Sequence, residues 1–160
     1  MLRDELFQPI ARFSRVAEEI VFKDLGLVAR TSLIAEAGLG LFAARFFAKG
    51  EIICEYTGDD LQTKDAIRLG DKSYLMRLGP QVYVDARNRP EVAARYINDC
   101  RNALHYNCQF DKRPDDMKAL VLATKDVELG QEIFVDYGKF YWFRRNPRRV
   151  ASLTKCSLLP

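Results

Sequence analysis

Two short stretches place polar side chains where such groups need a partner. Residues 95–100 (RYINDC) set Arg95, Asn98 and Asp99 among apolar anchors, with no helical or strand spacing that would put all three on one solvated face. Residues 132–138 (EIFVDYG) begin as a strand pattern and end in a tyrosine beside a glycine. Polar groups held among apolar residues either find hydrogen-bond partners inside the fold or contact a ligand. We therefore predict that the two stretches meet in space and form a binding site.

A third stretch could bring the backbone itself close to a ligand. Gly38 and Gly40 bracket one leucine, and Phe42 follows. Glycine adopts backbone dihedrals that other residues avoid and lets the chain approach a ligand closely, although a Gly-x-Gly pair is also common in plain turns. The third glycine of the dinucleotide-binding pattern and its strand–helix–strand surroundings are missing, which disfavours a dinucleotide fold.

Short strands must position these three stretches. Strand-like patterns separated by turn residues are found at 27–30, 52–56, 73–78, 81–85, 119–124 and 132–135, with a further extended piece at 107–110. A Gly-Pro pair at 79–80 predicts a hairpin turn, and short helices are predicted at 63–69 and 90–96. Many short strands without regular strand–helix alternation predict a mainly β fold with short helices (α+β), built from small curved sheets.

The chain begins with a helical pattern. Within residues 2–24, apolar side chains recur at steps of three or four, namely Leu6, Ile10, Phe13, Ala17, Ile20 and Val21. No linker rich in Gly, Ser or Pro follows, so a second domain is not expected. We predict a helical leader at 1–26, the main domain at 27–143 and a basic tail at 144–160.

The composition is that of an ordinary globular domain. A length of 160 residues, with 48% hydrophobic and 29% charged residues, suits one domain with a sizeable core. No apolar run approaches the ~20 residues that span a bilayer, and the first residues lack the pattern of a signal peptide. We therefore expect an intracellular protein without membrane contact.

The net charge of +3 is too small to argue for nucleic acid by itself. The C-terminal tail is more basic, and it is either a solvated segment or a contact for an acidic partner such as nucleosomal DNA. The residues that would make this contact are Arg144, Arg145, Arg148 and Arg149.

The four cysteines are not spaced like a metal site. None belongs to a CxxC pair, so structural zinc is not expected. We expect Cys54 to be buried in a strand and Cys156 to be incidental. His105, the only histidine, is expected on a surface loop rather than as a general base.

Four motifs, in their order along the chain, resemble those of the SET domain, the fold of protein lysine methyltransferases. They are GLGLFA at 38–43, EYTGD at 55–59, RYINDC at 95–100 and ELGQEIFVDYG at 128–138. Each motif is weak alone, but together they occur at family-like separations, and the resemblance covers about residues 31–141. It implies that the third and fourth motifs interlock in a pseudoknot, which the pattern alone would not predict because threaded chains are rare.

The resemblance implies S-adenosylmethionine as methyl donor and a lysine side chain as acceptor. It makes Tyr137 the central hydroxyl, which positions the methyl group and the amine, and Tyr56 a wall of the lysine channel. Both could instead be packing residues with a solvated tip. Arg95 is expected to brace its loop rather than pair with a carboxylate. The resemblance assigns the amino-acid end of the donor to the amide of Asn98 and to backbone groups of Gly38, Leu39, Gly40, Leu41 and Phe42.

Three features depart from the family pattern. The family's histidine after the asparagine is Asp99 here, which we keep as a backbone contact to the donor. Residues 101–106 replace the family's usual Cys-x-Pro. After Gly138 the chain continues as KFYWFRRN, where many relatives have a zinc-binding cysteine cluster. This aromatic run either closes the site or packs on the core, and Trp142 is the residue expected to stack on adenine.

Val135 bears on the number of methyl groups added. In the family, the residue two before the catalytic tyrosine is often Phe or Tyr and limits the room around the amine. A valine leaves space for an amine that already carries a methyl group, so di- or trimethylation is predicted.

The resulting hypothesis is an S-adenosylmethionine-dependent protein-lysine N-methyltransferase. A histone tail is its leading substrate, which would place it in the nucleus as a chromatin regulator. The alternative is a SET-fold module that binds peptide or chromatin with weak or no turnover, suggested by Asp99 and the altered loop after it. A third hypothesis is an interaction domain whose basic tail binds the partner. The presence of both Asn98 and Tyr137 favours the enzyme.

Overall fold

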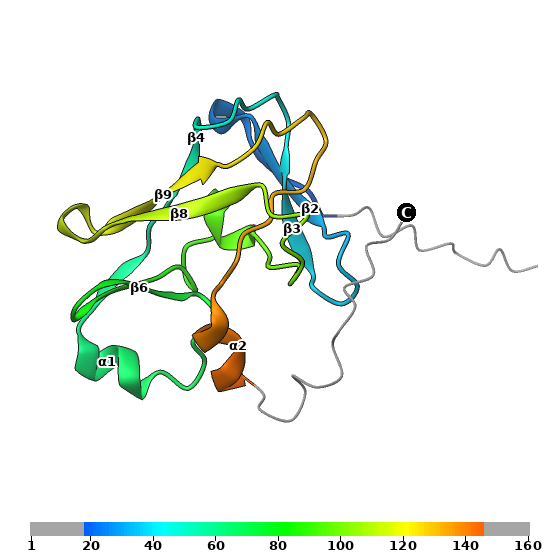
Figure 1. Ribbon diagram of the computed structural model, residues 1–160. Coiled ribbons are helices and arrows are strands. Elements are labelled where there is room, and N and C mark those ends of the chain that lie inside the picture. Colours follow the sequence, from blue (N-terminus) through cyan, green and yellow to red (C-terminus); the bar gives the residue numbers. More distant parts are fainter. Residues whose placement is uncertain (1–17, 146–160) are drawn as a thin grey trace, which may run out of the picture.

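The structure, a computed structural model, describes residues 18–145 and contains three small antiparallel sheets within them (Figure 1). The first sheet pairs β1 (Ile20–Phe22), β2 (Leu27–Thr31) and β3 (Leu39–Ala43). The second pairs β4 (Ile52–Tyr56), β9 (Lys118–Ala123) and β8 (Cys108–Arg113). The third pairs β5 (Asp59–Leu61), β7 (Val82–Asp85) and β6 (Leu75–Gly79). The predicted mainly β fold of small sheets is confirmed.

Short helices lie between the strands and after the last of them. They are α1 (Thr63–Arg68), α2 (Lys139–Arg145) and the 3-10 turns η1 (Lys23–Leu25), η2 (Ala93–Tyr96) and η3 (Pro114–Asp116). The helix predicted at 63–69 is confirmed as α1, and the one predicted at 90–96 is the tighter η2. Within residues 18–145, no helix is both long and apolar enough to cross a membrane.

Strand β9 shows how the alternation in the sequence becomes a sheet. Ala119, Val121 and Ala123 are buried while the residues between them are half-buried, the period of two that a strand imposes. Backbone groups on its two edges pair with β4 and β8, which makes β9 the central strand of its sheet. Cys54 lies buried in β4 as predicted, and burial raises the pKa of its thiol to about 12. Cys156 lies outside the described residues.

The helical leader predicted at 2–24 is wrong at its described end. Residues 1–17 lie outside the described part, but Ile20, Val21 and Phe22 form a strand that pairs with residues 27–29 of β2. The side chain of Val21 is 66% exposed, so it does not belong to a buried helix face. Ile20 and Val21 fit the spacing of a helix, but pairing with β2 determines the conformation of these β-branched residues and of Phe22.

The strand predicted at 132–135 is also different in the structure. This segment is extended but makes isolated bridges, antiparallel from Glu132 to Phe42 and parallel from Phe134 to Asn98. Successive residues meet different neighbours, so no continuous ladder forms. The backbone N–H of Val135 donates to the carbonyl of Asn98, and the N–H groups of Asn107 and Cys108 donate to the carbonyl of Phe134.

The segment at 132–138 therefore runs past both ends of the loop formed by residues 98–107. Its orange ribbon in Figure 1 crosses this part of the molecule before it enters α2. The interlock implied for the third and fourth motifs is present in these contacts. It brings residues about 40 positions apart in the sequence next to each other at one place.

Candidate active site

Asn98 connects three of the predicted motifs. Its side-chain amide donates to the carbonyl of Leu39 at 3.0 Å and to Oε1 of Glu132 at 3.5 Å. Its backbone carbonyl accepts the N–H of Val135 at 3.1 Å. The start of β3, the loop at 98–107 and the segment at 132–138 thus meet at this one residue.

Glu132 is a buried carboxylate that fixes the glycine strand. It accepts hydrogen bonds from the hydroxyl of Ser32 at 2.6 Å and from the N–H of Leu33 at 2.7 Å. Burial raises the pKa of Glu132, and these hydrogen bonds oppose the shift. A Cβ at position 40 would lie 2.0 Å from Oε1 of Glu132, so Gly40 is required by this packing. Gly38 has a positive φ of 77°, which favours glycine for a different reason.

Two of the five residues predicted to offer backbone groups to a donor contact the segment at 132–138. The carbonyl of Leu41 accepts the N–H of Ile133 at 2.8 Å, and Phe42 pairs with Glu132. Both side chains are buried in the core. The contacts of Gly38, Leu39, Gly40, Leu41 and Phe42 with a donor stay a prediction.

Tyr137 lies against the Asn98 segment, so the two stretches meet as predicted. Its hydroxyl donates to the carbonyl of Ile97, the residue directly before Asn98. Its ring packs edge-on against Tyr141, with centroids 4.5 Å apart, and nearly parallel to Trp142 at 6.1 Å. The first turn of α2 thus covers Tyr137 with two aromatic side chains.

Asp99 is only 7% exposed, and its carboxylate accepts four hydrogen bonds. Oδ1 accepts the hydroxyl of Tyr106 and the N–H of Arg101, both at 2.7 Å. Oδ2 accepts the N–H of Tyr137 at 3.0 Å and the indole Nε1–H of Trp142 at 2.8 Å. The prediction for this residue involved only its backbone, and the part played by its side chain was missed.

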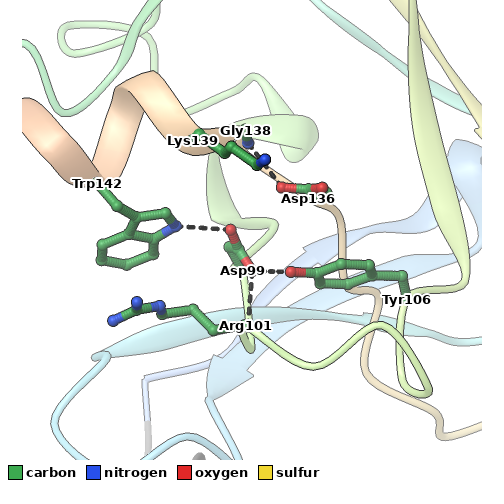
Figure 2. A pocket seen from close by; sticks show the side chains of 7 residues that line it. All are labelled: Asp99, Arg101, Tyr106, Asp136, Gly138, Lys139 and Trp142. Carbon is green, nitrogen blue, oxygen red and sulfur yellow. Dashed lines mark hydrogen bonds between the residues drawn. The ribbon is translucent and has the colours of Figure 1, made fainter. Parts of the chain in front are cut away.

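A cavity of about 360 Å³ opens beside this carboxylate (Figure 2). Its walls come from the loop after Asn98 and from the turn into α2, and they consist of Asp99, Arg101, Tyr106, Asp136, Gly138, Lys139 and Trp142. The guanidinium of Arg101 lies 5.0 Å from the centre of the Trp142 ring. Figure 2 shows the indole pointing its N–H at Asp99 from one side while Tyr106 approaches from the other.

Tyr56 is 6% exposed at the end of β4. Its hydroxyl donates to the carbonyl of Tyr74 at 2.7 Å, and burial raises the pKa of this phenol, so it stays neutral. The guanidinium of Arg95 lies 4.4 Å from the centre of the Tyr74 ring and donates to the carbonyl of Arg87 at 3.1 Å. Arg95 therefore braces this region, as predicted.

Val135 lies on the same segment as Tyr137 and is 1% exposed.

Sequence reasoning missed the contributions of Glu132 and Tyr106. An acidic residue among the apolar residues of a strand pattern could have pointed to Glu132, whereas nothing in the spacing marks Tyr106. His105 is exposed on its loop, as predicted. Among residues 18–145, no three His, Cys, Asp or Glu side chains are grouped to hold a metal ion.

Comparison with known families matches residues 38–138 to the family described as the SET domain. This range includes all four motifs from GLGLFA to the glycine after Tyr137 and covers more than half of the chain.

Curated proteins with related sequences are lysine methyltransferases by name. The chain is 32% identical to the N-lysine methyltransferase KMT5A-A of Danio rerio over 114 residues, which are 63% of this chain and 32% of that protein. It is 26% identical to the histone-lysine N-methyltransferase SETMAR of Mus musculus over 140 residues, 79% of this chain and 45% of that protein. It is 32% identical to the H3 lysine-4 specific histone-lysine N-methyltransferase of Schizosaccharomyces pombe over 110 residues, 62% of this chain and 11% of that protein. The chain thus spans less than half the length of these relatives.

Proposed function

The chain belongs to the SET-domain family of protein lysine methyltransferases, and on this premise we propose that it transfers methyl groups from S-adenosylmethionine to lysine side chains of a protein substrate. One observation carries the proposal. The segments that carry Tyr137 and Asn98, from two motifs about 40 residues apart, are held side by side by the hydrogen bond from the Tyr137 hydroxyl to the carbonyl of Ile97 and by the bridge between 98 and 134.

Lysine must lose its proton before it can act as a nucleophile. A lysine amine has a pKa of ~10.4 in water, so near pH 7 almost all of it is charged and lacks a lone pair. A water-poor channel with aromatic walls disfavours the charged form. Tyr56, Tyr137 and Tyr141 supply such walls, and the buried phenol of Tyr56 has a raised pKa that keeps it neutral.

The Tyr137 hydroxyl is oriented to position an amine rather than to remove its proton. It already donates its hydrogen to the carbonyl of Ile97. A phenol oxygen that donates its hydrogen in this way can also act as a hydrogen-bond acceptor, here toward an amine N–H. A fixed acceptor aligns the nitrogen for in-line attack, and alignment supplies much of the rate enhancement in two-substrate reactions.

The residues around the cavity suit S-adenosylmethionine. A volume of about 360 Å³ lies within the range of small-molecule sites. Trp142 offers an aromatic plane for the base, and Asp136 offers oxygens for the hydroxyl groups of the sugar. Asn98 does not line this cavity but directly precedes Asp99 in the chain, and it would bind the amino-acid end. When bound, the cofactor supplies an electrophilic methyl group on a positively charged sulfur.

The substrate class we propose is a histone tail, with di- or trimethylation of its lysine. Two of the related proteins are named histone-lysine N-methyltransferases, which supports the histone choice and with it a nuclear role. The small side chain of Val135 supports more than one methyl group. The arginines at 144, 145, 148 and 149 would contact nucleosomal DNA, and their side chains lie outside the described part of the structure.

The test is transfer of a labelled methyl group from S-adenosylmethionine to core histones and to nucleosomes. Wild type is compared with Tyr137→Phe and Asn98→Ala. Tyr83→Phe and Asn88→Ala make the same chemical changes on β7 and in an exposed turn. We expect both site variants to lose transfer by about a hundredfold or more and both controls to keep it.

If the two site variants lose transfer and the two controls keep it, the result supports the enzyme, and the modified lysine can be mapped by digestion. If wild type binds S-adenosylmethionine by calorimetry but modifies no histone, the substrate is another protein. If wild type neither binds the cofactor nor transfers a methyl group, the methyltransferase proposal is wrong and a binding module remains.

A further inference from the structure

The Asp99 carboxylate is the point where three separate segments join. Its four donors come from its own loop (Arg101 and Tyr106), from the turn before α2 (Tyr137) and from α2 itself (Trp142). An ionised carboxylate offers about four lone-pair sites, so the two oxygens are fully used, with two donors on each. A buried carboxylate is tolerated only with such compensation.

We propose that Asp99 is a positioning residue: its carboxylate fixes the indole of Trp142 against Tyr137 and thereby sets the affinity for the methyl donor. This inference rests on the proposed function for the identity of the donor. The positioning role belongs to the side chain of Asp99, a residue at which the sequence departs from the family pattern.

Helix α2 needs such an anchor because it has only 7 residues. Isolated helices of this length are not stable in water, so contacts with the rest of the fold must hold it. The side chains of Phe140 and Lys139 are exposed, with Phe140 at 85%, and do not hold it to the core. The indole N–H of Trp142 donates to Asp99, which makes this hydrogen bond a direct link from the helix to the Asn98 loop.

The loop is shaped to present the carboxylate. Arg101 has a φ of 53°, a left-handed conformation that costs a non-glycine residue energy. In this conformation its N–H donates to Oδ1 of Asp99 at 2.7 Å, and its guanidinium lies over the ring of Trp142. The hydroxyl of Tyr106 holds the same oxygen from the far end of the loop.

A histidine could not take over this role. Neutral imidazole has one acceptor nitrogen, and the charged form has none. At least three of the four donors around Asp99 would lose their partner. Restoring the family's histidine in this chain should therefore impair it rather than improve it.

Trp142 is the only tryptophan in the sequence, so the tryptophan emission of the protein reports on the surroundings of this indole. The experiment compares the dissociation constant for S-adenosylmethionine in wild type, Asp99→Asn, Asp99→His and Trp142→Phe. The tryptophan emission spectrum is compared among wild type and the two Asp99 variants, which keep Trp142. Asp115→Asn, an exposed carboxylate beside β8, is the matched control. Far-ultraviolet circular dichroism and a cooperative melting curve establish that each variant is folded.

We expect Asp99→Asn and Asp99→His to shift the Trp142 emission and to weaken donor binding by about tenfold or more, with Asp115→Asn unchanged. The double variant Asp99→Asn/Trp142→Phe should bind no more weakly than the worse single variant, because both substitutions remove the hydrogen bond between the indole and Asp99. Unchanged emission together with unchanged affinity in folded Asp99→Asn would overturn the proposal, and so would additive losses in the double variant.

If the Asp99 variants do not fold, the affinity of Trp142→Phe for S-adenosylmethionine tests the proposal by itself. It keeps an aromatic ring and removes the N–H, so donor affinity equal to wild type would contradict the positioning role. If wild type itself does not bind the donor, the proposed function fails. In that case the emission of Asp99→Asn still tests whether the carboxylate holds the indole.

Discussion

At the scale of single residues, the hydroxyl groups of the two tyrosines of the candidate site make the same kind of hydrogen bond. Tyr56 and Tyr137 each donate their hydroxyl hydrogen to a backbone carbonyl, of Tyr74 and Ile97 respectively. A phenol in this state is a neutral acceptor toward the site. Such a pair guides an amine by its N–H groups, which agrees with a positioning role and not with a general base.

Val135→Phe should limit the product. A ring in place of two methyl groups fills space next to Tyr137, so an amine that already carries a methyl group no longer fits. We expect the variant to stop at monomethyl-lysine, where wild type proceeds further. Mass spectrometry of the substrate at long reaction times measures the distribution. Wild type that yields only monomethyl product at completion would contradict this account.

The control for this substitution is Val127→Phe. Val127 is also fully buried but pairs with Phe47, in another part of the fold. Overfilling a core typically costs about 1–3 kcal/mol of stability, so both variants should melt earlier. Only Val135→Phe should change the number of methyl groups.

Glu132 makes the free energy of unfolding depend on pH. Burial raises the pKa of Glu132 above its ordinary value of 4.5, so the folded protein holds this proton more tightly than the unfolded chain does. The contribution is fully present below the unfolded pKa and declines as the pH rises through the folded pKa. Glu132→Gln cannot titrate. Urea unfolding from pH 4 to pH 7 should therefore show the free energy of wild type falling relative to the variant, whereas parallel curves would contradict the shift.

At the scale of elements, strand β3 is positioned from two sides. Its register with β2 places Gly40 opposite Arg30, and Glu132 lies over Gly40 from the segment before Tyr137. From the sequence, the glycine pair at 38 and 40 was expected to let the backbone approach a ligand closely. At Gly40 the approaching group is a carboxylate of the protein itself.

Gly40→Ala should destabilise the fold strongly. The added Cβ would lie 2.0 Å from Oε1 of Glu132 and 3.2 Å from the Cα of Ser32, so the carboxylate must give up its hydrogen bonds or the strands must separate. We expect a loss of about 2 kcal/mol or more in the free energy of unfolding. Gly70→Ala is the control, because a Cβ there meets no atom within 4 Å. Equal effects of the two substitutions would contradict this packing.

Elements whose conformation follows from the pattern of their own residues were predictable from the sequence. Strand β9 alternates because one face is buried, and helix α1 has a short pattern of its own. Strand β1 and the extended segment at 132–135 were not, because their conformation depends on pairing with distant residues. In the site, Asn98 and Tyr137 could be predicted to meet. The bonds to Asp99 could not, since they depend on where a loop and a short helix lie.

At the scale of the whole molecule, the interlock holds the site and the fold together. Asn107 is 8% exposed, and its amide donates to the carbonyl of Glu132 and accepts the N–H of Phe134, both at 2.9 Å. These bonds replace the ladder that a regular strand would have made. Both backbone groups belong to the segment that carries Tyr137.

Asn107→Ala should therefore weaken stability and activity together. It leaves a buried carbonyl and a buried N–H each without this partner, and one such group costs about 1–3 kcal/mol. We expect a loss of about 2–4 kcal/mol by urea unfolding, and slower methyl transfer at temperatures where the variant is still folded. Asn102→Ala is the control, because its side chain accepts only a loop N–H, that of Leu104. If Asn107→Ala lost no more stability than Asn102→Ala, the interlock would be held by the direct backbone bridges and not by this amide.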